Sequence, residues 1–292
     1  MAFPQEKLTL KSPAKINLGL KIIKKRDDGY HDIETIFQMV SIFDILTLRR
    51  IQSGIVFKTD QKKLPVDETN LVIKAAKLLQ QKTGTQYGVE ILLEKSIPIG
   101  AGLGGGSGNA AFTLMGLNML WKLNLKQNNM KKLALSLGSD VPFFMSGPTA
   151  IGKGRGEILT PFENRLIIPV VVVFPNIFIS SASIYKELNW GLTSKSKDIN
   201  ILSSLLAEGK IAELGTCLYN DLETIICKKH PILTKIKEKL LQSGAIGALV
   251  SGSGSSVFGL FLQPETARKA TTKLFRKDWQ VFLTETINQS MN

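Results

Sequence analysis

Residues 98–115 read PIGAGLGGGSGNAAFTLM, with six glycines among the nine positions from Gly100 to Gly108. So few side chains let backbone N–H groups turn toward a ligand without a Cβ in the way. The alternating segment 88–95 before the glycines predicts a strand, and residues 109–122 after them predict a helix. A helix N-terminus carries about half a positive charge. One or two glycines would suit a close-packed turn, but six at a helix start favour an anion such as phosphate.

The commonest dinucleotide motif does not fit this loop. Gly100, Gly102 and Gly105 satisfy G-x-G-x-x-G literally. The fingerprint also requires an acidic residue about 20 positions further on. The sequence has no Asp or Glu between Glu94 and Asp140, which argues against a Rossmann site.

Two further phosphate motifs are also missing. The nearest P-loop match runs from Gly147 to Lys153 and continues with Gly154, which has no hydroxyl for magnesium. The HRD and DFG motifs of protein kinases do not occur. The loop therefore predicts a different kind of phosphate cradle.

The hydrophobic pattern of the whole chain predicts an α+β protein, because strands and helices do not alternate strictly. Ile16, Leu18, Leu20 and Ile22 alternate with polar residues and predict a strand with one buried face. Strands are expected at 14–23, 33–51, 54–60, 88–95, 166–175, 246–250 and 256–261, with a closing strand near the end, and helices at 70–84, 109–122, 129–138, 198–215, 217–228, 231–243 and 264–276. The glycine-rich, charged stretch 152–165 has the content of a connection, so we expect domains at 1–155 and 156–292.

The composition favours an anionic partner but does not indicate which kind. Lysine and arginine outnumber acids 37 to 24, and the formal charge of +13 would favour nucleic acid, acidic lipid or phosphorylated metabolites alike. No stretch approaches the ~20 apolar residues of a membrane span, so a cytoplasmic protein is expected. Cys217, Cys227 and His230 offer three soft ligands where structural zinc needs four, which favours free thiols.

Several motifs agree with one family. The segment PIGAGLGGGSGNAA resembles the ATP-binding motif of the GHMP kinase superfamily, which phosphorylates small molecules. Residues 13–40, PAKINLGLKIIKKRDDGYHDIETIFQMV, resemble the N-terminal motif of one member of that superfamily, which acts on a cytidylyl substrate, and residues 247–261, GALVSGSGSSVFGLF, resemble the third motif of the superfamily. LGSDVPFFMSG and NDLE also fit, so the resemblance spans nearly the whole chain in the right order. Gly108 departs from the pattern, because the family usually has a second serine there.

The resemblance implies a fold and two catalytic residues. The fold is a two-domain α+β GHMP kinase fold, with an N-terminal domain like ribosomal protein S5 domain 2, a ferredoxin-like C-terminal domain and the site between them. Asp140 could by itself cap a short helical turn. The resemblance makes it the acid-base residue that accepts the substrate's hydroxyl proton, with Lys15 beside it to hold the carboxylate ionised. Asn17 would orient the substrate.

The resemblance also implies the binding residues. A cytosine ring would be recognised by Tyr30, His31 and Tyr185, with Ser181 as a polar contact; Tyr185 stands where the family often has Phe. Ser107 would lie near the β-phosphate and Mg²⁺, and Lys95 near the adenine or its ribose. The ATP phosphates would be wrapped by Pro98, Ile99, Gly100, Ala101, Gly102, Leu103, Gly104, Gly105, Gly106, Ser107 and Gly108. The loop of Gly252, Ser253 and Gly254 would support this first glycine loop.

The activity so implied is ATP- and Mg²⁺-dependent phosphorylation of a hydroxyl on a cytidylyl substrate, in the non-mevalonate route to isoprenoid precursors. The protein would be a cytoplasmic monomer or weak homodimer, with no nucleic-acid or membrane partner. A kinase of the mevalonate or homoserine type is the alternative, against which the segment DDGYH argues. A binder of RNA or of an anionic surface, using the +13 charge, is the alternative from another class.

Overall fold

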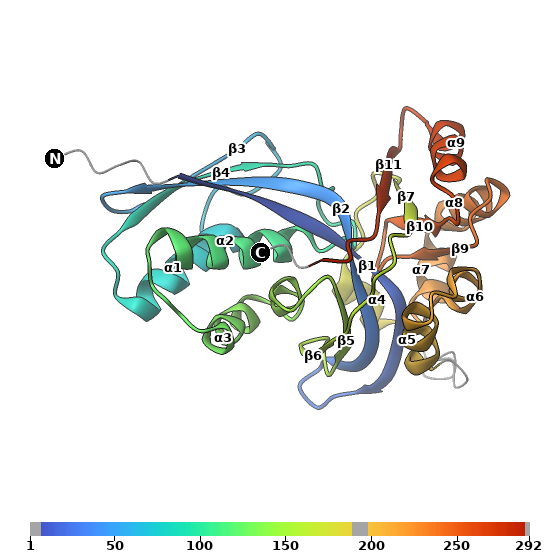
Figure 1. Cartoon of the computed structure of the whole chain (residues 1–292), viewed down its shortest axis with the longest axis horizontal. Coiled ribbons are helices and arrows are strands. Elements are labelled where there is room, and N and C mark those ends of the chain that lie inside the picture. The colour runs from blue at the N-terminus through green and yellow to red at the C-terminus, as the bar shows by residue number, and fades with distance from the viewer. Residues whose placement is uncertain (1–6, 189–197, 290–292) are drawn as a thin grey trace. The chain divides into compact units, whose positions relative to one another are not determined.

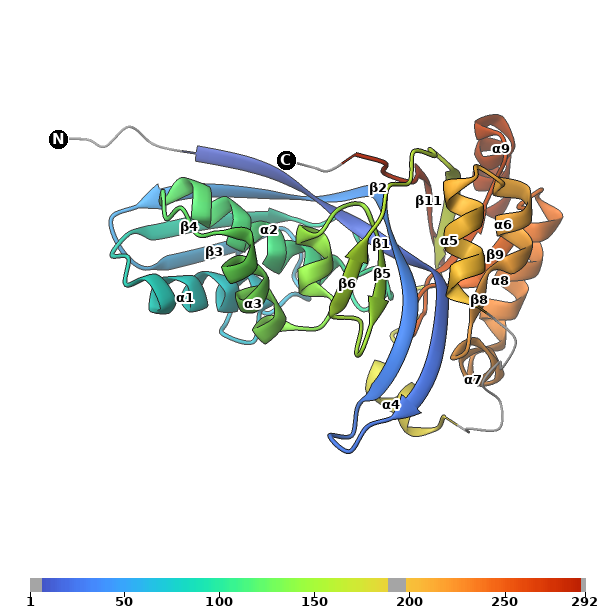
Figure 2. The ribbon, with the colours of Figure 1, turned by 60° about the horizontal axis from the view of Figure 1, so that its bottom comes forward.

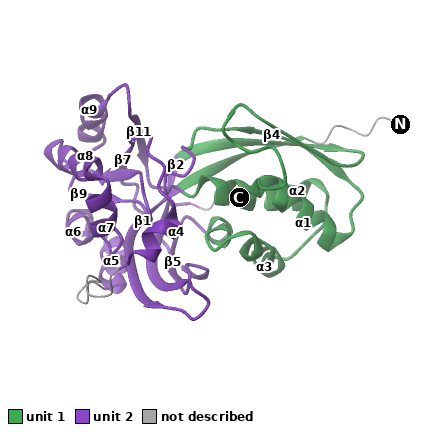
Figure 3. Cartoon of the chain, turned by 180° about the vertical axis from the view of Figure 1, so that it is seen from behind, with its two compact units in different colours: residues 1–14, 42–97, 104–145 green, residues 15–41, 98–103, 146–292 purple. Residues whose placement is uncertain are grey.

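The computed structural model describes residues 7–188 and 198–289. The chain forms two compact units (Figure 3). Unit 1 consists of Met1–Ala14, Ile42–Ile97 and Gly104–Met145, and unit 2 of Lys15–Ser41, Pro98–Leu103 and Ser146–Asn292. Each unit is assembled from several segments of the chain, so the single boundary expected at residue 155 stays a prediction.

Unit 1 is a sheet with helices on one face (Figures 1 and 2). Its strand order is β3-β4-β2-β1, and the long strands β2 and β1 also contribute to unit 2. The elements are β1 (Lys7–Lys25), β2 (His31–Ile51), β3 (Ile55–Thr59), β4 (Gly88–Glu94), α1 (Leu71–Thr83), α2 (Gly105–Leu120), α3 (Gln127–Leu137) and the 3₁₀ turn η1 (Val141–Met145). As expected, α1 ends before Gly84, whose φ of 67° is the left-handed conformation of a helix stop.

The helix after the glycine loop begins earlier than the sequence predicts. We expect its start at residue 109, but α2 begins at Gly105. Gly104 has a φ of 70°, which turns the chain into the helix, and the glycines that follow adopt helical geometry. The glycine-rich stretch is therefore a loop in its first half and a helical turn in its second.

The first strand also differs from expectation. The alternation in β1 predicts one buried and one polar face, but the structure buries both faces from Ser12 to Leu20. Lys15 is 4% exposed and Asn17 is 1% exposed. Polar residues can be buried on this face because their side chains bond to one another and to nearby groups.

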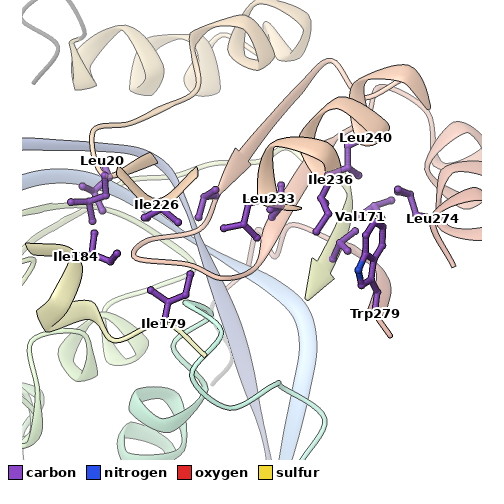
Figure 4. Packing of buried hydrophobic residues seen from close by; sticks show 14 of the residues in the cluster. Leu20, Val171, Ile179, Ile184, Ile226, Leu233, Ile236, Leu240, Leu274 and Trp279 are labelled. Carbon is purple, nitrogen blue, oxygen red and sulfur yellow. The ribbon is translucent and has the colours of Figure 1, made fainter. Parts of the chain in front are cut away.

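Unit 2 contains a four-stranded antiparallel sheet in the order β11-β7-β10-β9. These strands are β7 (Pro169–Phe174), β9 (Gly247–Val250), β10 (Val257–Leu260) and β11 (Gln280–Glu285), with helices α8 (Pro231–Gln242) and α9 (Pro264–Leu274) packed on them. The chain order β7-α8-β9-β10-α9-β11 and this strand order form the expected ferredoxin-like arrangement. Its core includes Leu20 from β1, Ile236, Leu240 and Trp279 (Figure 4).

Three segments of unit 2 differ from the sequence-based expectation. Part of the expected connection 152–165 forms a hairpin of β5 (Thr149–Lys153) and β6 (Ile158–Pro161), and the helix expected at 198–215 is split. Gly209, at φ 75°, separates α5 (Ile199–Ala207) from α6 (Ile211–Cys217). The helix expected at 217–228 starts later as α7 (Glu223–Lys229), because β8 (Tyr219–Asn220) pairs in parallel with β1.

The remaining helix of the described residues is α4 (Ser181–Lys186). The α+β class is confirmed by the mixed sheets and helices of both units. Across residues 7–188 and 198–289, no helix combines the length and the apolar character needed to cross a membrane.

Candidate active site

The first half of the glycine loop, Pro98–Leu103, belongs to unit 2 and is hydrogen-bonded to the loop 251–256. Ser256 N donates to Ala101 O at 3.0 Å, and Ser251 Oγ donates to Gly102 O at 3.0 Å. Gly102 has a φ of 76°, and a Cβ on it would lie 2.2 Å from Ser251 O. Backbone meets backbone here, so this position requires glycine. The support that the sequence predicts from the second glycine loop is confirmed.

Lys15 lies beside the same two loops. Its backbone N–H donates to Leu103 O at 2.9 Å, and its ammonium donates to Asn17 Oδ1 at 2.7 Å. A Cβ on Gly252 would lie 3.5 Å from Lys15 Nζ and 3.3 Å from Asn17 Oδ1. The structure thus brings together two of the expected site residues, Lys15 and Asn17, next to the backbone of Gly252.

Two residues that sequence reasoning missed hold this arrangement. Thr35 on β2 accepts from Asn17 Nδ2 at 2.8 Å and donates to Gly19 O at 2.7 Å. Asn220 donates to Val250 O at 2.9 Å and to Gly252 O at 2.7 Å, which fixes the second glycine loop. The motif NDLE was a signal for Asn220, whereas Thr35 looks like any polar residue of a strand.

Two of the expected cytosine-recognition residues form an aromatic pair. The rings of His31 and Tyr185 stack with centroids 5.1 Å apart. Burial, and secondarily the charge of Lys25, lower the pKa of His31 below its ordinary value, which favours the neutral imidazole. Ser181 Oγ lies 2.6 Å from Ser253 Oγ, so α4, which also carries Tyr185, is joined to the second glycine loop.

Tyr30 lies differently from its neighbour His31. Its side chain is exposed, and the guanidinium of Arg155 lies 4.9 Å from its ring centroid. Cation–π contacts of this kind contribute little when exposed. A role for Tyr30 in substrate recognition stays a prediction.

The second half of the glycine loop, Gly104–Gly108, opens α2 in unit 1. The N-cap Gly104 provides no side-chain cap, and the first turn has no acidic residue. The first N–H groups of a helix have no intrahelical acceptor and carry partial positive charge. This helix end, with Ser107 in its first turn, fits a phosphate group.

Gly108 occupies a position where a side chain would be crowded. A Cβ there would lie 2.9 Å from Ser12 Oγ, 3.1 Å from Pro13 O and 3.2 Å from an atom of the Phe144 ring. A serine at 108 would therefore need its neighbours to shift. The crowding at residue 108 therefore agrees with the presence of glycine where the family usually has serine.

Lys95 is held by a carboxylate that the sequence analysis did not single out. Its side chain, 5% exposed, forms an ion pair with the fully buried Asp44. A Cβ on Gly105 would lie 3.2 Å from Lys95 Nζ, so the ammonium lies at the start of α2. The signal for Asp44 was a single acid among apolar residues, SIFDILTL. A contact of Lys95 with adenine or ribose stays a prediction.

Asp140 lies in unit 1, directly before η1. Its carbonyl accepts from Phe143 N at 3.3 Å, as in the helical turn that the sequence allows. Lys15 belongs to unit 2, so the expected pairing of the two residues stays a prediction. Within the described ranges, no group of three or more His, Cys, Asp or Glu side chains could hold a metal ion. The role of Ser107 toward Mg²⁺ also stays a prediction.

Comparison with known families defines the class. The model of the GHMP kinases N terminal domain matches residues 70–148, and that of the GHMP kinases C terminal matches residues 202–280. The first match contains the start of α2 and Asp140, and the second contains the loop 251–256. The fold and the glycine loops are thus those of a GHMP small-molecule kinase, as the resemblance predicts.

Individual relatives narrow the class. The 4-diphosphocytidyl-2-C-methyl-D-erythritol kinase of Syntrophomonas wolfei is 38% identical over 276 residues, covering 94% of this chain and 97% of the relative. A crystal structure of 4-(cytidine 5′-diphospho)-2C-methyl-D-erythritol kinase has a TM-score of 0.84 at 34% identity, covering 96% of this chain and 99% of that one. The chain belongs to the 4-diphosphocytidyl-2-C-methyl-D-erythritol kinase family within the GHMP kinases.

A more distant structure has the same fold. The homoserine kinase of Cytophaga hutchinsonii has a TM-score of 0.79 at 19% identity, covering 99% of this chain and 98% of that one. Such identity supports the fold alone, and not the substrate.

Proposed function

We propose that this protein transfers the γ-phosphate of ATP to the 2-hydroxyl of 4-diphosphocytidyl-2-C-methyl-D-erythritol, giving the 2-phosphate and ADP. The reaction belongs to the non-mevalonate route to isoprenoid precursors. A cytoplasmic enzyme, active as a monomer or weak homodimer and without a nucleic-acid or membrane partner, is part of the same proposal.

The stacked pair of His31 and Tyr185 is the structural observation that carries the substrate assignment. A pyrimidine base can extend a stack of aromatic rings, and the rings of His31 and Tyr185 form such a stack with centroids 5.1 Å apart. The bond between Ser181 and Ser253 ties α4 to the loop that packs on Gly102. Within unit 2, hydrogen bonds thus connect the helix that carries Tyr185 with the first half of the glycine loop, which supports a shared role in binding the cytidylyl substrate and ATP.

The proposed chemistry is an in-line displacement at the γ-phosphorus. The 2-hydroxyl oxygen attacks, its proton passes to the carboxylate of Asp140, and ADP leaves. Lys15, with Asn17 fixing its ammonium, would stabilise charge on the transferred group. Positioning and electrostatics would supply most of the rate enhancement.

We propose that both halves of the glycine loop bind the phosphates of ATP and the accompanying Mg²⁺. The uncapped start of α2 fits an anion, and the glycines leave the backbone accessible. Mg²⁺, with Ser107 as one ligand, would neutralise charge on the phosphates.

The experiment that tests this function follows ADP release from purified protein given ATP, Mg²⁺ and one alcohol at a time. We expect turnover with 4-diphosphocytidyl-2-C-methyl-D-erythritol and none with mevalonate or homoserine. Turnover of mevalonate or homoserine alone would replace the substrate assignment. Strong, salt-sensitive RNA binding that persists in Asp140→Ala and Lys15→Ala, without turnover of any alcohol, would favour a nucleic-acid binder.

A further inference from the structure

Asp44 is a fully buried carboxylate that accepts from four N–H donors. One oxygen accepts from the backbone N–H groups of Ser96 and Ile97, both at 2.8 Å. The other accepts from Asn109 Nδ2 at 3.0 Å and from the Lys95 ammonium. All of these residues belong to unit 1. A buried charge with every oxygen engaged is costly to disturb, so its partners are held firmly.

The donors to Asp44 come from both sides of the glycine loop. Ser96 and Ile97 directly precede Pro98, where the loop begins, and Asn109 directly follows Gly108, where it ends. Lys95 is held a second time, because its backbone N–H donates to Asp60 Oδ1 at 3.0 Å. One carboxylate on β2 thus bonds to the chain on entering and on leaving the loop.

Asp44 also determines where the Lys95 ammonium lies. That ammonium is next to Gly105, at the positive end of α2, where a cation alone would be unfavourable. The opposite charge of Asp44 makes the position tolerable.

We propose that Asp44 is a positioning residue for nucleotide binding, which fixes both ends of the glycine loop and holds Lys95 at the start of α2. This inference rests on the proposed use of the loop for ATP. It does not depend on which alcohol is phosphorylated. The hydrogen bonds of Asp44 go to residues on either side of the loop, so its proposed role is to position the loop and not to take part in catalysis.

The test compares Asp44→Asn with Glu90→Gln, measuring the Kd for ATP in the presence of Mg²⁺ by calorimetry and the melting temperature. Asparagine keeps one acceptor oxygen but sets a donor against Lys95 and Asn109. We expect the Kd for ATP to rise about tenfold or more, since small displacements of binding groups are costly. Glu90 on β4 is paired with Arg49 and Lys58 at the surface, so its variant should bind ATP normally.

Kinetics separate positioning from general damage. In Asp44→Asn, the KM for ATP should rise while the KM for the second substrate stays within about twofold of the wild-type value. An unchanged Kd for ATP with a lowered melting temperature would overturn the proposal in favour of a purely structural role. Tighter ATP binding would also overturn it, because it would mean that Asp44 acts only as a negative charge near the phosphates.

A second variant tests the same proposal if Asp44→Asn does not fold. Asn109→Ala removes one of the four donors, together with an amide oxygen that is buried without a partner among the described residues. Folding should therefore be retained, and the Kd for ATP should rise by about threefold, a smaller change in binding free energy than that expected for Asp44→Asn. A normal Kd for ATP in this variant would contradict the proposed fixing of the loop's far end. Because ATP binding is measured without the second substrate, a wrong alcohol assignment would not affect the outcome.

Discussion

Lys15 Nζ donates a 2.7 Å hydrogen bond to Asn17 Oδ1, and both side chains are buried on the polar face of β1. Asn17 is in turn fixed by Thr35 on β2. The ring centroid of Phe37 lies 5.4 Å from the same ammonium. A cation held by an amide and an aromatic ring, beside the loop 251–256, is positioned before any ligand arrives.

Replacing Lys15 should therefore lower the rate more than the stability. We expect Lys15→Met to reduce kcat about 10²-fold, in the range seen when one transition-state donor is lost. Lys24→Met is the matched control, because Lys24 lies on the same strand with its side chain 70% exposed. Steady-state kinetics of both variants check this, and a Lys15→Met enzyme as fast as the control would exclude Lys15 from catalysis.

Asp140 should be required for turnover but not for ATP binding. We expect Asp140→Ala to lose about 10²-fold or more in kcat, since a general base contributes that much, while the Kd for ATP stays near the wild-type value. Single-turnover assays and calorimetry measure the two quantities separately. Near-normal turnover in this variant would remove Asp140 from the proposed role.

Two glycines of the loop should respond oppositely to alanine. A Cβ at Gly102 would lie 2.2 Å from Ser251 O at a positive φ, so Gly102→Ala should cost about 2 kcal/mol or more of unfolding free energy. Gly106 is helical, and its Cβ would meet only Leu71 at 3.8 Å. Gly106→Ala should therefore gain about 0.5–1 kcal/mol. Urea unfolding measures the free energy of unfolding of both variants. Equal values for the two variants would contradict this steric explanation.

Gly108 and Ser12 should be coupled. Gly108→Ala brings a Cβ within 2.9 Å of Ser12 Oγ and should cost about 1–3 kcal/mol, as overpacking does. Ser12 Oγ is buried with no hydrogen-bond partner among the described residues. Ser12→Ala alone should thus be neutral or stabilising. In the double variant the cost should be smaller than the sum of the two single changes, and strict additivity would rule out the contact.

His31 should titrate below the ordinary histidine range. Burial and the charge of Lys25 lower the pKa of His31 in the folded protein. On acidification, the His31 imidazole is therefore protonated at a higher pH in the unfolded chain than in the folded protein. The unfolding free energy should therefore fall as the pH drops below about 6.5. NMR titration in a His230→Gln background leaves His31 as the only histidine. A pKa at or above 6.5 would contradict the prediction, and in His31→Gln this part of the pH dependence should be lost.

Local features of the fold could be read from neighbouring residues. The existence of the strand β1 follows from a local hydrophobic pattern, and the helix stop at Gly84 and the end of α3 before Gly138 follow from short-range backbone preferences. The glycine loop indicated an anion for the same reason, since missing Cβ atoms and a following helix are both local properties. Motifs recognised in order along the chain then indicated the kinase family.

The sequence by itself therefore determined most of the helices and strands, the presence of a glycine loop suited to an anion, and the family to which the chain belongs. Only the tertiary structure decided which side chains support that loop. Gly102 meets Ser251, which is 149 residues away, and Asp44 reaches Asn109, 65 residues away. Periodicity carries no information about such pairs, because it records only whether a position faces a core. Asn17 and Asp44 are buried polar residues whose hydrogen-bond partners come from other strands and loops, and Lys15 contacts both Asn17 on its own strand and the ring of Phe37 on β2. The long-range partners are brought together only when the chain folds.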